Sequence, residues 1–272
     1  MTDPIVSSQW LFENKNNPNP NLVILDASQK SITADKAINH KQQIVGARYF
    51  DLKNSFSDKS SNFPNTFPST AQFETECRKL GINNESVIVV YDNLGIYSSP
   101  RVWWMFKTMG HQNVFVLNGG LSDWLENKYP TEKIEPQQYK LGNFKAELNT
   151  EKVKDYAFVK ANLNNKNSIV IDARSAGRFN GTAPEPREGL RSGSIPNSIN
   201  IPFGDVLDNG KFKTKEELKT IFSKINSENK ELIYSCGSGL TACIILLAGE
   251  LVLPNTTSVY DGSWTEWAQI EK

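Results

Sequence analysis

The chain contains few of the residues on which disulfide-linked and metal-dependent proteins rely. Its 272 residues include only three cysteines and two histidines. Three scattered cysteines do not form a disulfide framework, and they do not combine with His40 and His111 at the spacing of metal ligands. We therefore expect no metal, no other cofactor and a reducing compartment.

The sequence also lacks net charge and long apolar runs. Lysine plus arginine number 30 and aspartate plus glutamate number 30, so no global field attracts nucleic acid or an anionic membrane. The longest apolar stretch, "ACIILLAGELVL", contains Glu250 and is too short to span a bilayer. The N-terminal residues show neither a signal pattern nor a clear transit pattern. We expect a cytoplasmic protein, with the mitochondrion as the alternative, and neither a nucleic acid nor a membrane as partner.

An internal repeat is the strongest feature that is present. Four segments of the first half recur in the second half, in the same order and at offsets of 146, 151, 144 and 143 residues. The pairs are "LVILDAS" (22–28) with "SIVIDARS" (168–175), "VGARYFDL" (45–52) with "PNSINIPF" (196–203), "VIVVYDNLGIYSS" (87–99) with "LIYSCGSGLTAC" (232–243), and "VFVLNGGLSDW" (114–124) with "TSVYDGSWTEW" (257–267).

Each copy alternates short apolar runs with helical segments, which predicts an α/β domain. Strands that alternate with helices form a mainly parallel sheet with helices on both faces. The polar stretch between the copies is the natural linker. We therefore predict tandem domains at 1–135 and 151–272, joined by a linker at 136–150.

Cys236 lies in a small, uncharged loop between a strand-like run and an apolar helix predicted at 241–253. Backbone N–H groups at a helix N-terminus favour an anion and lower the pKa of a thiol. The alternative is a buried cysteine that acts as a small hydrophobic residue. The repeat places Asp92 opposite Cys236, and a structural hydrophobe would hardly be exchanged for a carboxylate. We therefore expect an exposed, polar loop position and a reactive thiolate.

The surroundings of Cys236 exclude several cysteine chemistries. Neither histidine lies in a motif that pairs with it, as a protease requires. Ala242 stands where a tyrosine-phosphatase-like loop has arginine, and Gly239 stands where a CxxC redox pair has its second cysteine. A thiolate held by backbone N–H groups remains, and such a cradle also stabilises the anionic end of a persulfide.

The chain resembles the rhodanese superfamily, and within it the tandem-domain thiosulfate/mercaptopyruvate sulfurtransferase family, over nearly its whole length. The resemblance is carried by "SCGSGLTAC" (235–243), "VIDARSAGRFNGTAPEPREGLRSGSIPNSINIPF" (170–203), "SSPRVWWMFKTMGHQNVFVLNGGLSDWL" (98–125) and "YDGSWTEW" (260–267). It implies that the first domain is non-catalytic. It also implies that Cys236 takes sulfur from 3-mercaptopyruvate as a persulfide, releases pyruvate, and passes the sulfur to cyanide or to a thiol acceptor such as thioredoxin or a small thiol.

The resemblance also implies roles for other residues. Cys236 and Ser238 are the expected catalytic residues, and the expected substrate-binding residues are Arg178, Arg187, Gly237, Gly239, Leu240 and Thr241. A planar guanidinium suits the carboxylate of an α-keto acid. The alternative for each arginine is a surface residue or a salt bridge.

The side chains of the loop also indicate which sulfur donor is preferred. The thiosulfate-using branch carries basic side chains in this loop, whereas Gly237 and Ser238 are neutral, so we expect 3-mercaptopyruvate to be preferred. A thiosulfate sulfurtransferase and a non-enzymatic sulfur-relay protein are the alternatives. Relatives place an acid and a histidine near the loop serine, and here Lys53 and Asn65 stand at those positions.

Overall fold

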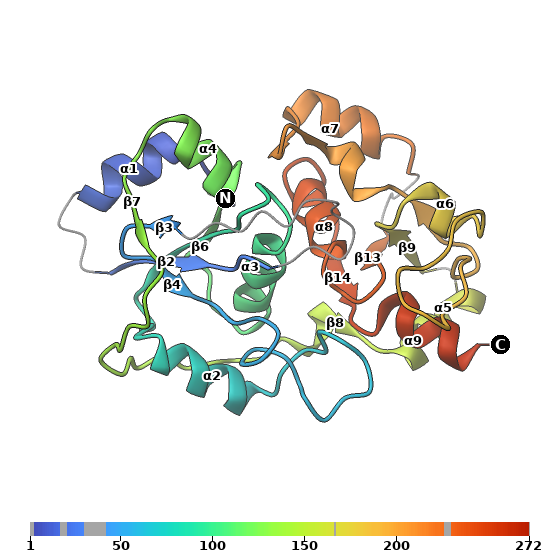
Figure 1. The fold of residues 1–272 in the computed structure, drawn as a ribbon. Coiled ribbons are helices and arrows are strands. Elements are labelled where there is room, and N and C mark those ends of the chain that lie inside the picture. Colours follow the sequence, from blue (N-terminus) through green and yellow to red (C-terminus); the bar gives the residue numbers. More distant parts are fainter. Residues whose placement is uncertain (1–2, 17–20, 30–41, 166, 226–229, 272) are drawn as a thin grey trace. The chain divides into compact units, whose positions relative to one another are not determined.

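The computed structural model describes residues 3–16, 21–29, 42–165, 167–225 and 230–271 (Figure 1). The chain divides into two compact units. The first comprises Met1–Asp58, Phe67–Leu148 and Asn209–Lys211, and the second comprises Lys59–Thr66, Asn149–Asp208 and Phe212–Lys272. His40, which we expect to have no catalytic role, lies outside the described residues.

The first unit is built on a parallel sheet in the order β1-β6-β5-β2-β4. Its central pair is in register from Leu22 opposite Val87 to Asp26 opposite Tyr91. The strands are β1 (Ile5–Val6), β2 (Leu22–Asp26), β4 (Arg48–Tyr49), β5 (Val87–Tyr91) and β6 (Val114–Leu117), and β3 (Gln42–Ile44) pairs antiparallel with β7 (Thr131–Lys133).

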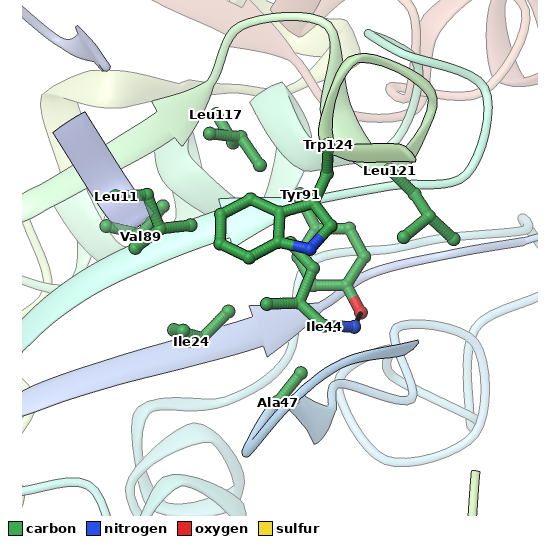
Figure 2. Close-up of a cluster of buried hydrophobic side chains, with 9 residues drawn as sticks. All are labelled: Leu11, Ile24, Ile44, Ala47, Val89, Tyr91, Leu117, Leu121 and Trp124. Carbon is green, nitrogen blue, oxygen red and sulfur yellow. Dashed lines mark hydrogen bonds between the residues drawn. The ribbon is translucent and has the colours of Figure 1, made fainter. Parts of the chain in front are cut away.

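Helices cover both faces of this sheet (Figure 1). They are α1 (Ser8–Asn16), α2 (Thr70–Lys79), α3 (Ser99–Thr108) and α4 (Gly120–Glu126). Successive strand residues point to opposite faces. On one face α1 and α4 pack onto alternate strand residues, in the buried cluster of Leu11, Ile24, Ile44, Ala47, Val89, Tyr91, Leu117, Leu121 and Trp124 (Figure 2). On the other face the rings of Phe73 in α2 and Phe106 in α3 pack edge to face.

The second unit repeats the topology of the first. Its parallel sheet has the order β10-β9-β13-β14-β8, so each strand has a counterpart in the first unit at the same place in the sheet. The strands are β8 (Val153–Lys154), β9 (Ser168–Asp172), β10 (Ile199–Asn200), β13 (Glu231–Ser235) and β14 (Thr257–Tyr260). The predicted fold class of two tandem parallel α/β units is confirmed.

Helices also cover the sheet of the second unit. They are α5 (Tyr156–Asn165), α6 (Ala176–Phe179), α7 (Lys215–Phe222), α8 (Ala242–Glu250) and α9 (Ser263–Ile270), with 3₁₀ turns η1 (Thr150–Lys152) and η2 (Phe203–Val206) and a ribbon of β11 (Leu207–Asp208) and β12 (Lys211–Phe212). Val159 of α5 and Trp264 and Trp267 of α9 pack on one face. Helix α8 packs on the other, where Gly249 lies against Tyr234 and Phe222. The residues of α8 from Ala242 to Gly249 are all buried, and this part of the helix is accordingly apolar on every side.

The end of the first unit is formed by residues that follow β7. Phe144 is buried against the rings of Phe106 and His111, and its N–H donates to the carbonyl of Ile82 at 3.1 Å. The part of the predicted linker up to Leu148 therefore packs on the first unit. Among the described residues, no helix is both long and apolar enough to cross a membrane.

Candidate functional site

Cys236 directly follows β13 and begins a turn that leads into α8. We call residues 236–241 the cysteine loop. Cys236 is 2% exposed, and its counterpart Asp92 in the first unit is fully buried. The expectation of an exposed position is therefore wrong. A carboxylate is accommodated inside the protein because its own loop supplies the hydrogen bonds, so the presence of Asp92 does not require solvent.

In the first unit, the loop after β5 forms an anion cradle, that is, a set of backbone N–H groups that converge on the carboxylate of Asp92. One oxygen of Asp92 accepts the backbone N–H groups of Tyr97, Ser98 and Ser99 at 2.8, 3.0 and 2.9 Å, and the Ser99 hydroxyl at 2.7 Å. Its other oxygen accepts the N–H of Leu94 at 3.0 Å. These N–H groups lie before and at the start of α3, so the helix dipole adds to them.

The cysteine loop keeps two of the corresponding N–H groups without the carboxylate, while the N–H of Cys243, the counterpart of Ser99, donates to the carbonyl of Leu240 at 3.2 Å. Thr241 and Ala242 are the counterparts of Tyr97 and Ser98, and within the described part of the chain their N–H groups donate to no protein acceptor. Donors that converge on one point suit an anion bound there. The geometry thus provides a place for negative charge next to Cys236.

Ser263, which the sequence reasoning missed, fastens the cysteine loop. Its Oγ accepts the N–H groups of Cys236 and Gly239 at 3.2 and 3.1 Å and donates to the carbonyl of Tyr260 at 2.8 Å. Ser263 has a φ of +51°, and its counterpart Gly120 has a φ of +54°. The internal repeat pairs Ser263 with Gly120. A serine at a position where the first copy has glycine is the sequence signal that could have found Ser263.

Two arginines lie beside Gly237. A Cβ built on Gly237 would be 2.9 Å from Nη2 of Arg178 and 3.6 Å from Nη1 of Arg187. Both guanidinium groups therefore reach the residue that follows Cys236, although they lie 59 and 50 residues before it in the sequence. Gly237 leaves space for them, and a side chain there would push the nearer one aside.

The two arginines differ in how their charge is compensated. Arg178 forms an ion pair with Glu185 at 2.6 Å, and Glu185 also pairs with the buried Arg174 at 2.7 Å. Arg174 in turn pairs with Asp172 at 2.6 Å. Arg187 donates only to hydroxyl oxygens, and no carboxylate among the described residues lies within ion-pair distance of it. One positive charge beside the loop is thus left for an anionic ligand.

Ser238 is hydrogen-bonded from two sides. Nη2 of Arg187 donates to its Oγ at 3.0 Å, and so does Nδ2 of Asn65, also at 3.0 Å. Asn65 belongs to the segment Lys59–Thr66, which the structure includes in the second unit. Lys53 is exposed in the first unit. The structure therefore brings Asn65 to the serine of the cysteine loop within the second unit.

A rhodanese-like domain model matches residues 7–127 and again residues 155–270, so it covers the cysteine loop and all strands of the two five-stranded sheets except the edge strands β1 and β8. The chain belongs to the rhodanese family.

Similar proteins match nearly the whole length of the chain. Human 3-mercaptopyruvate sulfurtransferase is 37% identical over 97% of this chain and 91% of its own length. Rat thiosulfate sulfurtransferase is 40% identical with the same coverage. Among solved structures, SseA from Escherichia coli, described as a 3-mercaptopyruvate sulfotransferase with the rhodanese fold, matches with a TM-score of 0.84 and 35% identity, covering 97% of this chain and 99% of SseA. The names of these relatives include two different sulfur donors.

The remaining residues of the cysteine loop, Gly239, Leu240 and Thr241, connect Ser238 to helix α8. Gly239 has a φ of +75°, which favours glycine. Leu240 is nearly buried, and Thr241 precedes the first residue of α8 without a side-chain cap. No group of three or more potential metal-ligating side chains occurs within the described ranges.

The other two thiols are buried in helices. Cys77 of α2 and Cys243 of α8 have no exposed surface. Burial raises the pKa of the Cys77 thiol well above its usual value, so it remains protonated. Cys243 donates its S–H to the carbonyl of Gly239 at 3.5 Å. Cys236 alone begins a loop whose N–H groups can hold charge.

Proposed function

We propose that this rhodanese transfers sulfane sulfur from 3-mercaptopyruvate to a thiol or to cyanide through a persulfide on Cys236, and releases pyruvate. The observation that carries the proposal is the pairing of an anion cradle at Cys236 with one uncompensated guanidinium, that of Arg187. The cradle suits the charged end of a persulfide, and the guanidinium suits the single carboxylate of the donor.

In the first step the Cys236 thiolate attacks the sulfur of the donor. The new S–S bond forms while the bond between sulfur and the methylene carbon breaks, and its electron pair goes to the pyruvate enolate. The proton of the donor's thiol accounts for the proton that converts the enolate to pyruvate, and Cys236 is left as an anionic persulfide. In the second step cyanide or a thiolate attacks the outer sulfur and restores the Cys236 thiolate.

The site residues have distinct roles in this scheme. Arg187, together with Arg178, binds the donor's carboxylate beside Gly237. Ser238 donates its hydroxyl to the carbonyl oxygen, which becomes negatively charged in the enolate. The N–H groups of Gly237, Gly239, Leu240 and Thr241 line the loop, and those facing the cradle stabilise the outer sulfur. A hydrogen bond that strengthens as charge develops lowers the barrier.

A thiosulfate sulfurtransferase is the second candidate, because relatives that are 40% identical bear that name. The loop carries no charge at Gly237 and Ser238, which favours the singly charged keto acid over the doubly charged thiosulfate. Measurement of kcat/KM with both donors distinguishes the two candidates. A higher value with thiosulfate would replace the first proposal by the second.

Mass spectrometry tests Cys236 as the sulfur carrier. After incubation with 3-mercaptopyruvate, the peptide that contains Cys236 should gain one sulfur atom, and Cys236→Ser should lose turnover while it keeps its fold. Cys243→Ser is the matched control, and it should keep turnover. Persulfide found mainly on Cys77 or Cys243 would overturn the assignment.

We further propose that the catalytic domain spans 151–272 and the non-catalytic domain 1–135, and that thioredoxin or a small thiol accepts the sulfur in the cytoplasm. The described cysteines are all free thiols, which supports a reducing compartment. Fluorescent tagging of the protein would test the compartment. Comparison of sulfide release with thioredoxin and with glutathione would test the acceptor.

A further inference from the structure

We propose that Asn65 is a positioning residue that keeps Ser238 a hydrogen-bond donor toward the departing enolate, with no titrating group involved. This inference rests on the proposed sulfur transfer and assigns a role to a residue outside the cysteine loop. Asn65 comes from the first half of the sequence, but its side chain reaches the loop serine within the second unit.

The orientation of the Asn65 amide follows from its contacts. Nδ2 lies 3.0 Å from Oγ of Ser238 and 3.3 Å from the carbonyl oxygen of the same residue. A carbonyl oxygen only accepts, so the amide must present its NH₂ group rather than its oxygen. The bond between Asn65 and the hydroxyl therefore runs from the amide to Oγ.

Arg187 is the second donor to the same oxygen. Its Nη2 lies 3.0 Å from Oγ of Ser238, and a guanidinium has no acceptor. A serine hydroxyl has two lone pairs and one proton. Because both of these neighbours donate, neither can take the proton. The hydroxyl of Ser238 is left to donate its proton to a ligand.

The local backbone holds Asn65 in place. Its φ is +58°, a left-handed conformation that asparagine adopts more readily than most residues do. The segment that carries it is closed by its own hydrogen bonds, since Oγ1 of Thr66 donates to the carbonyl of Phe63 at 2.9 Å and accepts the hydroxyl proton of Ser61 at 2.7 Å. The backbone and the hydrogen bonds of the segment thus fix the direction from which the Asn65 side chain approaches Ser238.

The arrangement has a chemical consequence. An asparagine amide does not titrate, and arginine stays protonated throughout the range in which enzymes work. The direction of the Ser238 hydroxyl is therefore independent of pH. Any pH dependence of pyruvate release then comes from other groups, and a carboxylate in place of the amide would reverse the direction of the bond.

The test compares two substitutions of Asn65. Asn65→Gly removes the amide without strain at positive φ and should lower kcat for pyruvate release by about 2- to 10-fold, the loss of one neutral hydrogen bond. Asn65→Asp has the same shape, but it accepts the Ser238 proton and repels the Ser238 carbonyl. It should lower kcat at saturating donor by about 10- to 150-fold, as for a hydrogen bond to a charged group.

A matched control and a second background separate the role of Asn65 from other effects. Asn62 is exposed on the same segment, and Asn62→Asp adds the same charge there without touching Ser238, so it should keep wild-type kcat. In a Ser238→Ala background, Asn65→Asp should cost no further activity, because the hydroxyl through which it acts is gone. Thermal melting checks that each variant is folded.

The outcomes are decisive. An equal loss from Asn65→Asp in both backgrounds, or a smaller loss than from Asn65→Gly, would overturn the positioning role while pyruvate release by the wild type still supports the proposed function. A wild-type protein that releases no pyruvate from 3-mercaptopyruvate would overturn the proposed function, and this inference with it.

Discussion

The difference between the two arginines at Gly237 can be tested directly, because their environments give different expectations. The charge of Arg178 is shared with Glu185, which lies 2.6 Å away, whereas Arg187 donates only to the hydroxyl groups of Ser238 and Thr265. A carboxylate that arrives at the site finds one guanidinium with a competing anion and one without. We therefore expect Arg187 to contribute more to the binding of the donor than Arg178.

The size of the effect follows from the kind of bond. A hydrogen bond to a charged group contributes about 1.5–3 kcal/mol, which corresponds to about 10- to 150-fold in affinity. Arg187→Ala should lower kcat/KM for 3-mercaptopyruvate by that factor. Arg178→Ala should lower it by less than about 10-fold, because the carboxylate of Glu185 takes part of the bond energy in the free protein and remains paired with Arg174 in the variant.

Steady-state kinetics separates binding from chemistry. Loss of a carboxylate contact that is equally strong in the ground and transition states appears in KM, and the smaller part that Arg187 contributes through Ser238 appears in kcat. Arg187→Lys should recover part of the loss, since it offers a point charge instead of a fork. Arg191→Ala is the control, because that exposed side chain bonds to the carbonyl of Glu271 instead. A loss from Arg178→Ala equal to or greater than that from Arg187→Ala would refute the reasoning.

Three further changes have defined expectations. Gly237→Ala should lower kcat/KM by no more than Arg178→Ala does, that is by less than about 10-fold, because it displaces Arg178, whereas Gly204→Ala, with nothing within 4 Å, should not lower it. Asp92→Ala should lower the free energy of unfolding in urea by about 3–5 kcal/mol, since it leaves several buried N–H groups unpaired; a loss below 1 kcal/mol would contradict the cradle. Burial lowers the pKa of His111, so its contribution to stability is full above about pH 6.5 and is lost as the pH falls below that value. His111→Gln should therefore flatten this part of the pH profile of the unfolding free energy, measured in urea. An unchanged slope would exclude His111 as the source of the pH dependence.

Much of the fold could be predicted because the necessary information is local. Buried parallel strands such as Leu22–Asp26 and Glu231–Ser235 appear in the sequence as short apolar runs, and the repeat shows that both copies share one topology. The predicted helix at 241–253 is observed as Ala242–Glu250. The repeat also identified Asp92 as the counterpart of Cys236. The hydrogen bonds of the first loop explain how a buried carboxylate is accommodated at that position.

The parts that could not be predicted depend on contacts between distant residues. Whether Asp92 is exposed depends on whether its own loop supplies donors, which the composition of the loop does not state. Asn65 was aligned with a histidine of relatives, but its place against Ser238 depends on the packing of Lys59–Thr66 with the second unit. The pairing of Glu185 with Arg178 depends on how the segment between β9 and β10 folds back on itself.

In the proposed mechanism, the difference between the two loops explains why only one copy of the duplicated fold is reactive. Both loops precede a helix and present backbone N–H groups to the residue that follows the central strand. In the first unit that residue is Asp92, whose carboxylate is part of the chain and cannot leave, so its charge is permanently compensated. In the proposed reaction Cys236 places an anionic sulfur at the same point, and that sulfur arrives with the donor and departs with the acceptor. A cradle that binds a fixed anion contributes only stability, whereas the same cradle with an exchangeable anion lowers the energy of an intermediate. In the proposed mechanism, replacement of a carboxylate by a thiol at one position therefore separates a loop that binds a fixed anion from a loop that binds an exchangeable one.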